Sequence, residues 1–132
     1  MRLEQVKVAG RGTIRRTPIL FVHGICHGAW CWQYWQSWFA GQGRTTTAVS
    51  LRGHGESEGR SGLNSYTLDD YVGDVIRTAD GMSQPPVLVG HSMGGAVVQK
   101  AFAKYPDAFR AVVLLASMPP NGMTKTEQFT LL

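Results

Sequence analysis

The chain has 132 residues, 43% of them hydrophobic, which suits one domain with a packed core and is too short for several. Its longest apolar run, residues 111–116, is too short to cross a bilayer, and its N-terminus shows no signal-peptide pattern. The net charge of +4 is concentrated in residues 1–16, which have five basic residues, one acidic residue and no recognisable nucleic-acid module. These properties argue against a membrane-spanning or nucleic-acid-binding protein and predict a cytoplasmic domain that begins with a basic hairpin or arm.

The first half of the chain predicts alternating strands and helices. Residues 3–8 predict an edge strand, and a turn at 10–12 predicts a hairpin that closes near Ile14. The continuous apolar run at 19–22 is typical of a strand buried on both faces of a parallel sheet. Residues 29–40 predict a helix, and 45–51 a second buried strand. Aromatic residues recur in that helix at spacings of three and four, and we interpret them as core packing rather than as a ligand-stacking surface: Trp32, Trp35, Trp38 and Phe39.

The second half continues the alternation. A polar glycine-rich loop at 52–59 leads to a helix that begins at Thr67, a plausible N-cap, and ends near residue 80. Strands at 87–89 and 111–116 enclose a helix that ends near Lys104, and residues 124–132 predict the start of another. We therefore expect an α/β fold with a doubly wound, mostly parallel sheet and helices on both faces. The loops 23–28, 52–59 and 90–94 should meet at the carboxyl ends of its strands, where such folds bind ligands.

The stretch from 87 to 98 has the sequence of a nucleophile elbow. An apolar strand is followed by Gly-His-Ser-Met-Gly at 90–94, which fits G-x-S-x-G, and then by a helix. The turn would raise the Ser92 hydroxyl above the sheet. Gly90 and Gly94 remove side chains that would collide with neighbouring backbone in so sharp a turn. The amide of Met93, at a helix N-terminus, would face an oxyanion formed there.

Three motifs in this order resemble the N-terminal half of an α/β-hydrolase, an esterase- or lipase-like serine hydrolase. They are Phe21 to Trp30, Ser50 to Ser57 and Gly90 to Gly95. The resemblance covers residues 17–122 and implies a single, incomplete domain over 1–132, without the C-terminal strands and most of the cap, whose start would be 123–132. Many relatives have an acid where this chain has Ser50. The dehalogenase and epoxide-hydrolase branches have an aspartate at the position of Ser92, so the serine argues against them.

The resemblance also implies roles for individual residues. Ser92 would be the nucleophile, and the N–H groups of Ile25 and Met93 would form the oxyanion hole. The residues that support the motifs would be His23, Gly24, Gly90, His91 and Gly94. The implied substrate is a small-molecule acyl compound, and neither a cofactor nor a metal is expected.

A catalytic serine also needs an acid and then a histidine, in the chain order Ser…Asp/Glu…His. After Ser92 the sequence has Asp107 and Glu127 but no histidine. One hypothesis is a serine hydrolase that cleaves ester, thioester or related acyl bonds through an acyl-enzyme on Ser92, with this chain inactive or weak without its histidine. The alternative is a non-catalytic acyl-binding or assembly module, or half of an enzyme completed in trans. An open sheet edge after the strand at 111–116 would favour self-association or a partner chain.

The upstream histidines are candidates to replace the missing base. His23 and His27 are interpreted as structural hydrogen-bonding residues, and the side chain of His91 should point away from Ser92. His54 is interpreted as a solvated loop residue, with the base as its alternative role, and Glu127 is a candidate acid. The two cysteines, at positions 26 and 31, are expected to be free thiols.

Overall fold

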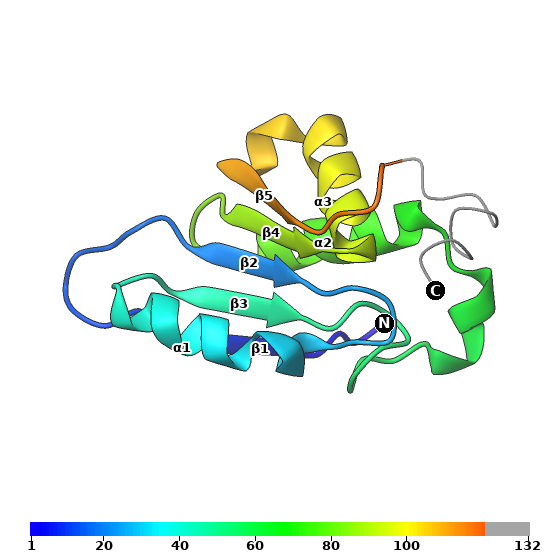
Figure 1. Ribbon diagram of the computed structural model, residues 1–132, viewed down its shortest axis with the longest axis horizontal. Helices are drawn as coiled ribbons and strands as arrows, with labels where there is room; N and C mark the ends of the chain where they lie inside the picture. The colour runs from blue at the N-terminus through cyan, green and yellow to red at the C-terminus, as the bar shows by residue number, and fades with distance from the viewer. Residues whose placement is uncertain (121–132) are drawn as a thin grey trace.

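The computed structural model describes residues 1–120, and in this part of the chain five strands form one mixed, mostly parallel sheet (Figure 1). The strands are β1 (Gln5–Val8), β2 (Ile19–Val22), β3 (Thr46–Val49), β4 (Val87–His91) and β5 (Ala111–Leu115). Their order in the sheet is β1-β3-β2-β4-β5. β2 pairs in parallel with both β3 and β4, β4 pairs in parallel with β5, and β1 is antiparallel to β3. The predicted fold class is confirmed.

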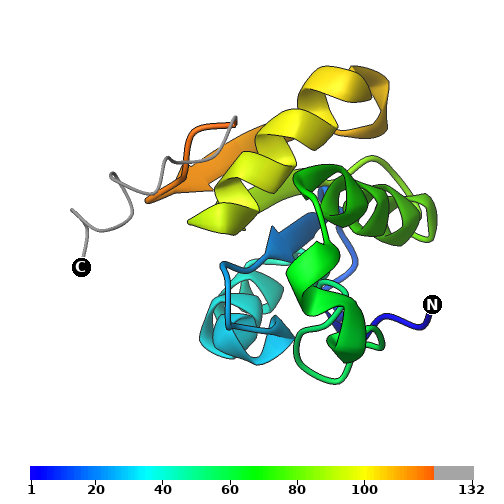
Figure 2. The ribbon, with the colours of Figure 1, turned by 90° about the vertical axis from the view of Figure 1, so that its right-hand side faces the viewer.

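Helices cover both faces of the sheet (Figure 2). α1 (Gln33–Gly41) lies on one face, and α2 (Leu68–Asp80) and α3 (Met93–Lys104) lie on the other. Three short 3-10 helices complete the described elements: Ala29–Trp32, Arg60–Ser65 and Pro106–Ala108. Side chains alternate along β2, so Leu20 and Val22 pack beneath α2 and α3, whereas Ile19 and Phe21 pack with Trp32 on the α1 face. This strand is therefore buried on both sides, as its apolar run predicts.

The start of α2 is defined by reciprocal capping. The Thr67 hydroxyl accepts a hydrogen bond from the Asp70 N–H, and the Asp70 carboxylate accepts one from the Thr67 N–H at 2.8 Å. That hydrogen bond to the carboxylate lowers the pKa of Asp70. The prediction that the helix begins at Thr67 is confirmed.

The predicted N-terminal hairpin is wrong. β1 pairs with β3, in a register that joins Gln5 to Val49 and Val8 to Thr46, and no strand follows the 10–12 turn before β2. Residues 9–18 instead run along the amino end of the sheet, where the Arg11 N–H donates to the Ala40 carbonyl at 2.9 Å. Among the described strands β1 is an edge strand, as predicted, but its partner is about forty residues away, and turn signals cannot reveal such a pairing.

The interpretation of the recurring aromatic residues at 32–39 as core packing is half correct. Trp32 is buried and stacks on Phe21 with ring centroids 4.8 Å apart, and Phe39 packs against the same cluster. Trp35 and Trp38, however, are 46% and 62% exposed. The inner face of this segment is formed by Trp32, Gln36 and Ala40, at a spacing of four residues.

Gln36 explains the rotation of α1 about its own axis. Its amide nitrogen donates to the Val6 carbonyl at 2.8 Å and to the Thr46 hydroxyl at 3.1 Å, so a polar residue joins α1 to β1 and β3. A buried amide can stay on an inner face only when its hydrogen bonds are made. The aromatic spacing therefore predicted the helix correctly but not its rotation about its axis.

β5 is the last strand of the sheet in the described part of the chain, and its Val113 and Leu114 side chains are exposed. No described helix combines the length and the apolar character that a bilayer crossing needs. The helix predicted from residue 124, the start of the cap at 123–132 and Glu127 lie outside the described residues.

Candidate active site

Ser92 lies at the apex of the turn between β4 and α3. Its backbone has φ 55° and ψ −118°, a conformation that non-glycine residues rarely adopt. Three backbone hydrogen bonds hold it there: its N–H donates to Leu115 at 3.2 Å, and its carbonyl accepts from Gly95 and from Met118, each at 2.9 Å. Strain of this kind persists only where the surroundings enforce it, and it is concentrated at functional sites.

Two glycines make this turn possible. A Cβ on Gly90 would lie 2.5 Å from the Gly94 carbonyl oxygen, and a Cβ on Gly94 would overlap with the carbonyl oxygens of Val22 and His23. Side chains at these positions would therefore push α3 away from β2 and β4. The glycines allow the helix to start directly above the sheet, with Ser92 at its N-terminus.

The loop after β2 runs against this turn. Gly24 is so close to the elbow that a Cβ there would lie 3.1 Å from the Ser92 Cβ and 3.3 Å from the His91 carbonyl oxygen. The next residues form a tight turn, in which the His27 N–H donates to Gly24 at 3.3 Å. Ile25 thus follows the residue that touches the serine. The N–H of Met93, in the first turn of α3, has no acceptor within its helix. Both predicted oxyanion donors therefore belong to segments that adjoin Ser92.

His23 is fully buried and joins this loop to the strand beside it. Its Nδ1 lies 2.6 Å from the Gly24 carbonyl oxygen, and its Nε2 accepts a hydrogen bond from the Leu51 N–H at 3.0 Å. This pattern requires a neutral ring that carries its proton on Nδ1. Burial lowers the pKa of His23 from 6.5 to about 4. The predicted structural role of His23 is confirmed.

The neutral state of His23 should make stability depend on pH. Below pH 6.5 the unfolded chain protonates this histidine, whereas the folded chain does so only near pH 4. The free energy of unfolding is therefore highest above pH 6.5 and decreases as the pH falls towards 4. The expected loss is about 3 kcal/mol in the free energy of unfolding. Urea unfolding at several pH values, followed by circular dichroism, measures it. The variant His23→Gln should flatten this dependence, whereas His91→Gln should keep it. A wild-type slope in His23→Gln would contradict this origin.

Two of the other upstream histidines, His54 and His27, differ from expectation. His54 is buried rather than solvated, with its ring centroid 5.0 Å from that of His23 and its Nδ1 3.1 Å from the Arg52 carbonyl oxygen. Within residues 1–120 the His27 ring forms no hydrogen bond and instead stacks on His91, with ring centroids 5.9 Å apart. Within residues 1–120, no histidine is hydrogen-bonded to the Ser92 hydroxyl. The described residues therefore bring no base to the serine.

Glu4, which precedes β1, forms a hydrogen-bonded pair with Ser50, which follows β3. The Ser50 hydroxyl donates to Glu4 Oε1 at 2.6 Å and accepts from the Ala29 N–H at 2.8 Å. Glu4 also accepts from the Glu56 N–H at 3.2 Å. Glu4 and Ser50 thus tie the end of the 23–28 loop to the 52–59 loop. The contact joins residues 46 positions apart, and no local pattern in the sequence indicates it.

Asp74 is a second polar residue that the sequence analysis missed. It is fully buried, and Arg52 reaches it through its side chain at 2.8 Å and through its backbone N–H at 2.9 Å. Arg77 contacts the same carboxylate at 2.8 Å. These contacts fasten the start of the 52–59 loop to α2, and the hydrogen bonds that the Arg52 guanidinium donates to Asp74 raise the pKa of Arg52. The sequence signal that could have revealed the pair of Arg52 and Asp74 is the position of an aspartate on the apolar, inward-facing side of an amphipathic helix.

Both cysteines are free thiols, as predicted. Cys26 is exposed, Cys31 is half-buried, and burial raises the pKa of the Cys31 thiol. Over the described residues, no three His, Cys, Asp or Glu side chains are close enough together to hold a metal ion.

A mostly parallel α/β sheet with a strained serine between a buried strand and a helix has the backbone geometry of a nucleophile elbow. Residues 17–132 match the family described as alpha/beta hydrolase fold, and the chain belongs to that family. The resemblance seen in the sequence is thereby confirmed.

Known relatives of the chain include several esterases. It is 31% identical over 109 residues to Methylesterase 3 of Arabidopsis thaliana, a match that covers 81% of this chain and 41% of the relative. Among solved structures it is similar to a thioesterase domain from the curacin biosynthetic pathway, with a TM-score of 0.78, 25% identity, and coverage of 98% of this chain and 47% of that one. A monoacylglycerol lipase of Paleococcus ferrophilus shares the fold, with a TM-score of 0.76, 24% identity, and coverage of 99% and 49%. The chain spans about two fifths of the length of the curated relative and about half of each solved structure.

Proposed function

We propose that this chain carries the nucleophile and the oxyanion hole of a serine hydrolase that cleaves small-molecule esters, thioesters or related acyl bonds. The observation that carries this proposal is the backbone of Ser92, held at φ 55° between β4 and α3. In the proposed reaction the Ser92 Oγ bonds to the acyl carbon and its proton passes to a base. The bond to the leaving alcohol or thiol then breaks, and that group takes up a proton. Water releases the acid from the acyl-enzyme.

The oxyanion, which forms on the carbonyl oxygen of the substrate, would be stabilised by the N–H groups of Ile25 and Met93. Support comes from the close approach of Gly24 to the serine and from the position of Met93 in the first turn of α3. One such donor typically contributes about 3–4 kcal/mol to transition-state stabilisation. His23 would contribute indirectly, because its two hydrogen bonds hold the 23–28 loop, which contains Ile25, against the residues that follow β3.

The base is proposed to lie outside these 132 residues. The sequence has no histidine after Ser92, and the described histidines that precede it bond elsewhere or stack on one another. A histidine supplied by further polypeptide or by a partner chain would complete the site. The same observation favours the second candidate function, in which this chain alone binds an acyl group without turning it over.

The similarity to esterases named for methyl esters makes methyl carboxylates the first substrates to test.

Labelling with a fluorophosphonate probe tests the nucleophile. We expect intact mass to show one adduct, peptide mapping to place it on Ser92, and Ser92→Ala to abolish it. Ser37→Ala, an exposed serine on α1, is the matched control and should label normally. Hydrolysis of a p-nitrophenyl ester by the chain alone should hardly exceed background.

Each outcome separates the candidates. An adduct that survives Ser92→Ala would refute the assignment of the nucleophile, and no adduct on a folded chain would support the acyl-binding module. Turnover that is lost in Ser92→Ala but kept in His54→Ala would support a base supplied in trans.

A further inference from the structure

A cavity of about 580 Å³ lies at the end of the sheet opposite to Ser92. Its wall includes Pro18, Thr45 and Gln84, which precede β2, β3 and β4, whereas Ser92 follows β4. Figure 1 shows the long loop between β1 and β2 extending beyond this amino end of the sheet. The cavity is therefore separate from the candidate active site.

The lining of this cavity is cationic. Of the 13 described residues that line it, three are basic, namely Lys7, Arg15 and Arg16, and none is acidic. Within residues 1–120, none of these three forms an ion pair with a carboxylate. Three of the five basic residues in 1–16 thus line one hollow, and none of the three is paired with a described carboxylate. Uncompensated cations close to one another attract anions strongly.

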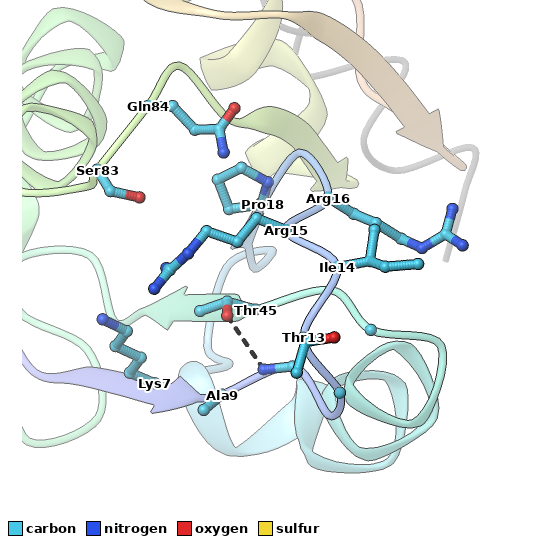
Figure 3. Close-up of a pocket in the computed structure, with 13 residues that line it drawn as sticks. Lys7, Ala9, Thr13, Ile14, Arg15, Arg16, Pro18, Thr45, Ser83 and Gln84 are labelled. Carbon is cyan, nitrogen blue, oxygen red and sulfur yellow. Dashed lines mark hydrogen bonds between the residues drawn. The ribbon is translucent and has the colours of Figure 1, made fainter.

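Figure 3 shows how the side chains are arranged. Arg15 extends across the cavity so that its guanidinium lies between Lys7 and Ser83, with the Gln84 amide above it, whereas Arg16 points the other way. A compact ammonium and a planar guanidinium face the same space, and a hydroxyl and an amide stand beside them. This set of donors suits an anion with several oxygens and more than one negative charge.

The backbone around the cavity is anchored rather than loose. The Gly10 N–H donates to the Thr45 hydroxyl at 3.0 Å, and Arg44 donates to the Thr17 carbonyl at 2.8 Å. Gly10 also lies against Gly43, where a Cβ would come within 2.7 Å of backbone atoms. The segment that carries Arg15 is therefore fixed at both ends before any ligand binds, which reduces the entropy cost of binding.

We propose that this cavity binds the phosphate group of a phosphomonoester, with Lys7 and Arg15 as its charged ligands and Ser83 as a hydrogen-bonding partner. A phosphomonoester dianion matches the two cations, and a volume of about 580 Å³ is within the range of small-molecule sites. The phosphate belongs either to a soluble metabolite or to the headgroup of an anionic lipid, since both present the same chemistry.

Calorimetric titration of the 132-residue chain with inorganic phosphate at low salt tests the site. We expect saturable binding that is weakened at least tenfold in Lys7→Gln/Arg15→Gln, because each cation forms charge-assisted hydrogen bonds with the anion. Lys104→Gln, an exposed lysine at the end of α3, removes a charge elsewhere and should bind as the wild type does. Ser92→Ala should also bind phosphate normally, so this result is independent of the proposed hydrolase. Circular dichroism confirms that each variant is folded.

Flotation with vesicles distinguishes the two sources of phosphate. Vesicles of phosphatidylcholine with phosphatidic acid should carry the wild type, but not the double variant, if the ligand is a lipid headgroup. Binding of phosphate without flotation assigns a soluble phosphomonoester. The proposal is refuted if the wild type binds neither probe, or if Lys104→Gln weakens binding as much as the double variant does.

Discussion

Replacing Asp74 by alanine is expected to lower the free energy of unfolding by about 3 kcal/mol. The carboxylate is fully buried and accepts hydrogen bonds from Arg52 and from Arg77, so its loss leaves two guanidinium groups without their partner. The value lies at the lower end of the range for broken buried ion pairs, because Arg77 is half exposed and can regain water. Urea unfolding followed by circular dichroism measures the change.

Asp69 provides the matched control on the same helix. Its carboxylate is largely exposed and lies 3.4 Å from Lys100, so Asp69→Ala should cost less than about 1 kcal/mol. Equal losses in the two variants would show that helix charge, rather than the buried pair, sets the stability.

Gly94→Ala is expected to cost about 3 kcal/mol in the free energy of unfolding. The added methyl group would overlap with the carbonyl oxygens of Val22 and His23, and backbone atoms cannot move aside as the end of a flexible side chain can. α3 would have to lift from the sheet and take the Ser92 turn with it. Fluorophosphonate labelling should therefore slow together with the loss of stability.

Gly73 is the internal reference for this prediction, since it also lies inside a helix. A Cβ there would meet nothing closer than an Arg52 nitrogen at 4.0 Å. Gly73→Ala should therefore raise the stability by about 1 kcal/mol, because alanine loses less backbone freedom on folding. If Gly94→Ala were stabilising as well, close contact at the elbow could not be the reason for its glycine.

The strands and helices could be predicted from short-range pattern. The apolar run at 19–22 coincides with β2, and the capping pair Thr67 and Asp70 defines the start of α2. The elbow could be recognised because its glycines and serine are adjacent in the chain. Local sequence carries information of this kind, since periodicity and capping act within a few residues.

The features that escaped prediction all depend on distant partners. The pairing of β1 with β3, the contact of Glu4 with Ser50 and the bond of Arg52 to Asp74 join residues more than twenty positions apart. His54 lies in a glycine-rich loop that its composition marks as solvated, yet the loop folds back and buries it. A polar residue is buried only where residues close to it in the fold form hydrogen bonds with it, and sequence periodicity does not identify those residues.

The rotation of α1 has a consequence for spectroscopy. All four tryptophans lie between positions 30 and 38, with Trp32 buried against Phe21 and the other three exposed. Tryptophan fluorescence therefore reports on the α1 side of the sheet and not on the side that carries α2 and α3. If the two layers separate at different denaturant concentrations, the emission of Trp32 and the far-ultraviolet signal of the helices will give different midpoints, and their coincidence is a direct test of whether the sheet unfolds as one cooperative unit.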